Sequence, residues 1–268
     1  MRPNEWLPLP DKIAVLVNAF TYDKRVGAAV FSYCCGLGPQ MANHPRLDRL
    51  VISYTHGYPT DRCRNAASAQ AKKDGFNFLL MLDDDQVPDL LLGKDPAAKP
   101  FFPTALDFAL SQPGPILIGA PYCGGPPAQD VMVMKNREYC PDQPGGAGYK
   151  MDRHTRDEAA VKTGVEKVAA LPTGCLLVDL RVLDALPPPW FSYEYGDAPY
   201  NTSLASTEDV VFTRNAHWIG VPQYVTWDCW AGHDKRYVTG KPRLAPVDEV
   251  PAAIYQAWSA GWRPANTH

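Results

Sequence analysis

Apolar runs of strand length that alternate with helical stretches restrict the fold of this chain more than any other feature. Residues 12–17 form an almost continuous apolar run, which is typical of a strand buried on both faces of a parallel sheet. Runs at residues 50–54 and 76–82 also predict strands, and the Ala-rich stretch from Arg64 to Asp74 between them predicts a helix. This alternation predicts an α/β fold built on a parallel or mixed sheet.

The helix between the second and third runs has candidate end signals. Thr60 or Asp61 is a candidate N-cap, and Gly75 is a candidate C-terminal stop. The alternation of predicted helices and strands then continues to about residue 229. It predicts helices at 89–92, at 104–111 and from Ser206 or Thr207 to Trp218, with Gly220 ending the last, and strands at 116–120, 175–180 and 223–229.

The 268 residues, 46% of them hydrophobic, suffice for one large α/β domain. We expect this domain to span residues 1–240, with a loop-rich insertion at about 124–165 that contains a short hairpin or helix. The insertion begins rich in Pro and Gly and then becomes charged. Residues 241–268, with helical content around 252–260, are expected to form a C-terminal tail that packs on the domain.

Three adjacent aspartates, Asp83, Asp84 and Asp85, follow the third apolar run directly. Ligands bind at the carboxyl ends of the strands in open α/β sheets, so this position indicates a binding site. Adjacent carboxylates repel one another, and a divalent cation such as Mg²⁺ or Mn²⁺ would supply the compensating charge. In an extended strand end, Asp83 and Asp85 would face one ion together. The alternative is an acidic turn in water.

Four further motifs surround the aspartates in a definite order: Asp61-Arg62-Cys63-Arg64-Asn65 upstream, then Pro172-Thr173-Gly174-Cys175, Thr207-Glu208-Asp209 and Gly232-His233. With this set the sequence resembles the GT-A glycosyltransferases, and among them the family 2-like enzymes encoded by phages and prophages. The resemblance covers about residues 12 to 236. It implies a Rossmann-like GT-A fold with a central mixed, mostly parallel sheet flanked by helices. It also implies transfer of a sugar from a nucleotide-sugar donor, by default a UDP-sugar, to a hydroxyl acceptor.

The resemblance assigns the donor side to the aspartates and a late histidine. Asp85 is implied as a direct ligand of Mn²⁺ or Mg²⁺, with Asp83 near the ribose or the metal's water, and His233 as the distant metal ligand. Asp84 belongs to the same cofactor-binding group, although its side chain is expected to face elsewhere. When bound, the metal neutralises the charge that builds on the departing nucleoside diphosphate.

The acceptor side is assigned by resemblance to Glu208 and Asp209. Asp209 would take the proton from the attacking hydroxyl, and Glu208 would position hydroxyl groups. A base of this kind implies inversion at the anomeric carbon. The alternative is that both residues only complement the helix dipole.

Nucleotide contacts are expected from two segments. Arg62, Arg64 and Asn65 would contact phosphate or hold the nucleotide-facing loop. Asn18 and Phe20 lie at the end of the first strand, where the nucleoside is seated in GT-A enzymes. Outside these segments, Tyr122 stands where the sugar could lie.

Other classes of protein compete with this interpretation. A haloacid-dehalogenase-like phosphatase uses Asp-x-Asp after a strand, with the first Asp as nucleophile, but normally after the first strand of its domain. A nucleotidyltransferase with a related α/β fold would also use the aspartates with Mg²⁺. A non-catalytic carbohydrate-binding module would have no use for metal carboxylates combined with Glu208, Asp209 and His233.

The composition of the chain limits which binding partners and which cellular compartment are expected. The net charge of −3 gives no overall attraction to nucleic acid or acidic membranes. The sequence starts without a signal-peptide pattern and contains no apolar run of membrane length. Its seven cysteines are irregularly spaced. Together these features predict a cytoplasmic protein, located in the host cytoplasm if it is phage-encoded. The expected partners are a nucleotide-sugar and a soluble acceptor, with a hydroxymethylated base in phage DNA as one candidate.

Overall fold

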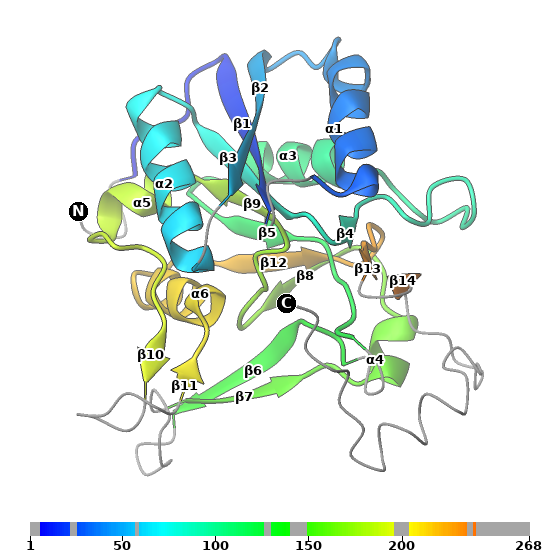
Figure 1. Ribbon diagram of the computed structural model, residues 1–268, viewed down its shortest axis with the longest axis vertical. Coiled ribbons are helices and arrows are strands. Elements are labelled where there is room, and N and C mark those ends of the chain that lie inside the picture. Colours follow the sequence, from blue (N-terminus) through cyan, green and yellow to red (C-terminus); the bar gives the residue numbers. More distant parts are fainter. Residues whose placement is uncertain are drawn as a thin grey trace.

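The computed structural model describes residues 6–21, 26–56, 59–125, 130–139, 149–195, 204–234 and 238–239. At its centre is a seven-stranded sheet of order β2-β1-β3-β9-β5-β12-β8 (Figure 1). Its strands are β1 (Ile13–Thr21), β2 (Leu47–His56), β3 (Phe78–Asp83), β5 (Leu117–Gly119), β8 (Val165–Val168), β9 (Cys175–Asp179) and β12 (Gln223–Thr226). Strands β8 and β9 run antiparallel to their neighbours and the other five run in one direction. The predicted mixed, mostly parallel sheet is confirmed.

Helices cover both faces of this sheet, as predicted (Figure 1). The helices are α1 (Ala28–Met41), α2 (Thr60–Lys73), α3 (Phe101–Ser111), α4 (Arg156–Ala160), α5 (Arg181–Ala185) and α6 (Glu208–Trp218). Every residue of β1 is buried, and successive side chains enter opposite layers. Ile13, Val15 and Val17 pack in the layer of α1 and α3, whereas Ala14 and Leu16 pack in the layer of α2, α5 and α6.

Smaller sheets surround the central one. β4 (Gln86–Val87), β13 (Gly232–Asp234) and β14 (Val238–Thr239) form a three-stranded sheet next to the aspartates. β10 (Glu194–Tyr195) pairs with β11 (Leu204–Ser206), and β6 (Met134–Tyr139) pairs with β7 (Tyr149–Arg153). Where a short hairpin or helix was expected, the described residues form the β6–β7 hairpin and helix α4, which begins with a capping box between Thr155 and Glu158. The tail 241–268 lies outside the described residues.

Two local predictions are wrong, and one helix lies where the sequence pattern gave no prediction. Helix α1 forms at 28–41 although Gly36, Gly38 and Pro39 disfavour a helix there, because its apolar side packs on the sheet. Helix α2 starts at Thr60 with Pro59 in the N-cap position, so neither Thr60 nor Asp61 caps it. Residues 89–92 form turns, not a helix, because Asp89 has a left-handed φ of 58°.

No helix among the described residues is long and apolar enough to cross a lipid bilayer.

Candidate functional site

The three aspartates lie where β3 leaves the sheet, at the carboxyl ends of the parallel strands. Asp83 is the last residue of β3 and stands beside Phe20 of β1. The Asp83 amide donates to the Gly174 carbonyl over 2.9 Å, and the Asp84 amide donates to the Phe20 carbonyl over 3.0 Å. Asp84 and Asp85 then form a turn that leads into β4. The extended geometry expected of Asp83 and Asp85 therefore ends at Asp83, and the two carboxylates meet different partners.

Asp85 meets His233. β13 pairs antiparallel with β4, so that His233 stands opposite Gln86, and the Asp234 amide donates to the Asp85 carbonyl over 2.6 Å. This pairing places His233 Nε2 3.4 Å from Asp85 Oδ2, with both side chains largely buried. The structure thus brings Asp85 and His233 together, and their predicted role as metal ligands stays a prediction.

The tautomer of His233 follows from its other ring nitrogen. Nδ1 lies 2.9 Å from the carbonyl oxygen of Cys123, which can only accept, so Nδ1 carries the proton. In the neutral ring, Nε2 then presents a lone pair toward a carboxylate oxygen. Two acceptors that face one another need a shared proton or a shared cation. A backbone carbonyl that fixes the ring in this way is also the usual support of a metal-ligating histidine.

Arg64 joins Asp83 to Glu208. The Arg64 guanidinium donates to Asp83 Oδ1 over 2.8 Å and to Glu208 Oε1 over 2.6 Å, and it also bonds the Thr173 hydroxyl. Burial alone would lower the pKa of Arg64, but the charges of Asp83, Glu208 and Asp209 outweigh it and hold the pKa above its ordinary value. Arg64 is therefore a permanent cation between the two groups of acids. A phosphate contact by Arg64 stays a prediction.

Glu208 and Asp209 form the first turn of α6, after Thr207 in the N-cap position. Burial raises the pKa of Glu208, the charge of Arg64 opposes the rise, and Asp209 adds to it. Asp209 is half-buried, and its Oδ1 accepts hydrogen bonds from the Thr207 hydroxyl and the Val210 amide. The two acids thus differ: one is locked in an ion pair, and the other is held by its own helix.

The remaining predicted nucleotide-binding residues are spread around the edge of the site. Asn18 is buried, with its amide nitrogen on Ser53 and its amide oxygen accepting from Thr55, so its side chain joins β1 to β2. Phe20 is buried at the end of β1. Arg62 is exposed on α2.

Asn65 points away from the aspartates. Its side chain bonds the backbone of Trp190 and Phe191, with distances from 2.7 to 3.2 Å, and so anchors the segment that precedes β10. Nucleotide contacts by these residues stay predictions.

The predicted metal site can be compared with the side chains that the structure places near Asp85 and His233. Among the described residues no three His, Cys, Asp or Glu side chains converge in a ready-made metal cluster. The pair formed by Asp85 and His233 nevertheless fits two neighbouring ligands of one ion, since ligands about 2.1 Å from Mg²⁺ or Mn²⁺ at right angles lie roughly 3.0 Å apart. The separation of 3.4 Å is close to that value. Mg²⁺ is commonly held by one or two protein groups together with substrate phosphates and water, so the incomplete set is suitable.

Two residues of the site carry no sequence signal. Gly27, which precedes α1, approaches the turn so closely that a Cβ atom there would lie 2.1 Å from the Asp84 carbonyl oxygen. Gln86 of β4 is buried against Gly174. Neither contact can be read from the chain, because each depends on segments distant in sequence.

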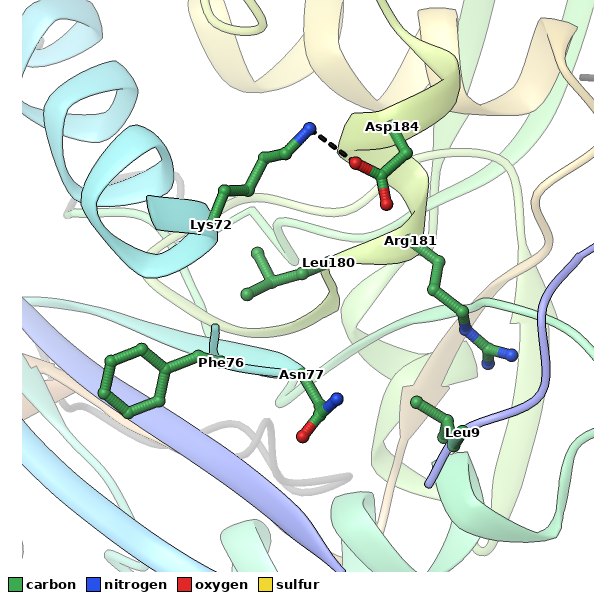
Figure 2. A pocket seen from close by; sticks show the side chains of 7 residues that line it. All are labelled: Leu9, Lys72, Phe76, Asn77, Leu180, Arg181 and Asp184. Atoms are coloured by element: carbon green, nitrogen blue, oxygen red, sulfur yellow. Dashed lines mark ion pairs between the residues drawn. The ribbon is translucent and has the colours of Figure 1, made fainter. Parts of the chain in front are cut away.

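A pocket of about 170 Å³ lies elsewhere, at the amino end of β3 (Figure 2). It is lined by Leu9, Lys72, Phe76, Asn77, Leu180, Arg181 and Asp184. Its charged groups are paired with one another or with neighbours: Lys72 with Asp184 at 2.6 Å, and Arg181 with Asp179 at 2.6 Å. This pocket contains none of the predicted site residues.

Fold and site together define a mixed α/β protein with an acidic site at the carboxyl edge of its sheet. No family model and no curated protein sequence matches the chain. Among solved structures, A197 from STIV is similar in fold, with a TM-score of 0.51 and 13% identity over 87% of this chain and 97% of that one.

Two further solved structures are similar with TM-scores under 0.5. GalNAc-T7 with UDP, GalNAc and Mn²⁺ has a TM-score of 0.46 and 10% identity over 84% of this chain and 44% of that chain. A glycosyltransferase involved in the glycosylation of the major capsid of PBCV-1 has a TM-score of 0.30 and 11% identity over 80% and 92% of the two chains.

Proposed function

We propose that this chain is a metal-dependent glycosyltransferase that moves a sugar from a nucleotide-sugar, a UDP-sugar by default, to a hydroxyl acceptor. The observation that carries the proposal is the approach of His233 Nε2 to Asp85 Oδ2 at 3.4 Å, with Nδ1 bound to the Cys123 carbonyl. This is a prepared pair of cation ligands at the strand ends where an α/β sheet binds its ligands. The order of motifs around it supports the same assignment.

On the donor side, Asp85 and His233 would hold Mn²⁺ or Mg²⁺, with diphosphate oxygens completing the coordination. The ion supplies a Lewis acid that neutralises charge on the leaving nucleoside diphosphate. Asp83, tied to Arg64, would act through the ribose or a metal-bound water. The charges fit: Arg64 is surrounded by Asp83, Glu208 and Asp209 and offsets only part of their negative charge, and Asp85 adds a further carboxylate beside His233.

On the acceptor side, Asp209 is the proposed base. Glu208 is engaged by Arg64, so it suits the fixed positioning of hydroxyl groups. Both hydrogen bonds given to Asp209 reach Oδ1, so Oδ2 is the oxygen that would accept the proton of the attacking hydroxyl. A product that retains the donor's anomeric configuration would contradict this part of the proposal.

A thermal-shift titration with UDP and Mn²⁺ tests the metal site. Ligand at one hundred times its Kd adds about 2.7 kcal/mol to the unfolding free energy, which raises the Tm by roughly 5 to 10 °C in a domain of this size. We expect this shift in the wild type and in Asp234→Ala, an exposed neighbour of the site. It should be absent from Asp85→Ala and His233→Ala. Equal shifts in all four proteins would refute the assignment.

Product analysis separates the competing enzymes. A glycosyltransferase releases UDP from a UDP-sugar, a nucleotidyltransferase releases pyrophosphate from UTP and a sugar phosphate, and a phosphatase releases phosphate from a simple monoester. For the acceptor, labelled sugar should be offered to hydroxymethylpyrimidine DNA and to unmodified DNA. Transfer to the first alone would support the modified base, and transfer to neither would direct the search to other hydroxyl compounds.

A further inference from the structure

Gln86 is a buried amide whose hydrogen-bonding groups are unused among the described residues. It lies in β4, one residue after Asp85 and opposite His233, and it is 1% exposed. Neither Nε2 nor Oε1 has a hydrogen-bond partner in the part of the chain that the structure describes. Gln223 of β12 is equally buried, but its amide nitrogen bonds the Thr213 carbonyl. An unpaired buried amide is costly, so a protein retains one where something else satisfies it.

The Gln86 amide lies beside another polar side chain of the site. A Cβ atom on Gly174 would lie 2.9 Å from Gln86 Nε2 and 2.7 Å from the Tyr122 hydroxyl, so both groups rest against the same bare backbone. The Tyr122 ring contacts His233 edge-on, with centroids 5.2 Å apart. Burial raises the pKa of Tyr122, and the charges of Asp83 and Asp209 raise it further, so this hydroxyl stays protonated and can donate a hydrogen bond.

We propose that the Gln86 amide and the Tyr122 hydroxyl, lying together over Gly174, bind hydroxyl groups of the sugar that is transferred. A carbohydrate hydroxyl can donate to Oε1 and accept from Nε2, so a neighbouring pair of hydroxyls matches both unused amide atoms. The position also fits, since Gln86 follows Asp85 and stands opposite His233, the pair that would hold the ion to which the diphosphate binds. Gln86 and Tyr122 are then specificity determinants, and Gly174 is required because any side chain would displace them. This inference rests on the proposed function.

The test separates recognition of the sugar from recognition of the nucleotide. Calorimetry in Mn²⁺ gives the Kd of UDP and of UDP-glucose, UDP-galactose, UDP-GlcNAc and UDP-GalNAc for the full chain. The ratio of the Kd of UDP to that of the best UDP-sugar measures the sugar's share. In Gln86→Met we expect this ratio to fall at least fivefold, while the Kd of UDP changes less than twofold. In Gly174→Ala, which displaces both groups, the ratio should fall as well.

Gln223→Met is the matched control, with an unchanged ratio and a lower Tm because it loses a hydrogen bond. Without ligand, Gln86→Met should be at least as stable as the wild type, since an unpaired amide is removed. An unchanged ratio in both Gln86→Met and Gly174→Ala overturns the inference. So does a drop in the Tm of Gln86→Met, which would reveal a structural partner of the amide. Failure of the wild type to bind UDP with Mn²⁺ refutes the proposed function itself, so the two failures are distinguishable.

Discussion

Removing the cation between the two acidic groups should destabilise the fold by an amount that the structure permits us to work out. Arg64 is 7% exposed and its partner Glu208 is 8% exposed, so Arg64→Met leaves the glutamate charge buried without a counterion. Loss of one partner of a buried pair costs about 3 to 5 kcal/mol. Asp83 is 18% exposed and can recover water, so the lower end, about 3 kcal/mol, applies. In a domain of this size the Tm should fall by roughly 6 to 12 °C.

Urea unfolding at pH 7 provides the measurement, with the m-value checked for two-state behaviour. Arg62→Met is the matched control, because Arg62 is exposed on the same helix and should change the unfolding free energy by less than about 0.5 kcal/mol. Adding Glu208→Gln to Arg64→Met removes the stranded charge and should restore part of the loss. A loss below about 1 kcal/mol in Arg64→Met, or no recovery in the double variant, would refute the reasoning.

Two further predictions concern the turn that follows the aspartates. Burial raises the pKa of Asp89 from 3.8 to about 6, so between these values the native state holds more protons than the unfolded state, and its stability falls as pH rises. Asp89→Asn, which retains an acceptor for the Phe101 amide, should therefore match the wild type near pH 4 and exceed it by up to about 3 kcal/mol at pH 7 in urea unfolding; a gain independent of pH would contradict this. Gly27→Ala forces a methyl group against the Asp84 carbonyl and should cost about 1 to 3 kcal/mol in thermal unfolding. The control is Gly36→Ala inside α1, where a Cβ atom meets no other atom within 4 Å and the change should be neutral or stabilising. If both variants lost the same unfolding free energy, the close approach of Gly27 to Asp84 would be rejected.

The sequence was informative where local pattern and burial agree. The run that ends at Asp83 became a central strand because its side chains enter two apolar layers, and a continuous apolar run is the sequence signature of burial on both faces. The mixed sheet could be predicted for the same reason. Helix α1 could not, because its Gly36, Gly38 and Pro39 oppose a helix locally and the sheet beneath it decides the outcome.

The sequence indicated which residues belong to the candidate site better than it indicated which partners their side chains contact. The motif order singled out Asp85 and His233, and the structure places them 3.4 Å apart, but this approach depends on β4 pairing with β13, about 150 residues away in the sequence. The sign of its charge made Arg64 a phosphate candidate, whereas its carboxylate partners become visible only when α2, β3 and α6 are assembled. The unpaired amide of Gln86 has no sequence signal at all.

The short strand β13 is synthesised after all seven strands of the central sheet. All seven strands of the central sheet are complete by Thr226, whereas the histidine that faces Asp85 arrives only with residues 232–234. During synthesis on a ribosome, the sheet can thus leave the exit tunnel before the proposed cation site has its second proposed ligand. A chain that stops just before Gly232 would keep all seven strands of the central sheet but lack His233. Such a truncated protein would serve as the negative control in metal titrations.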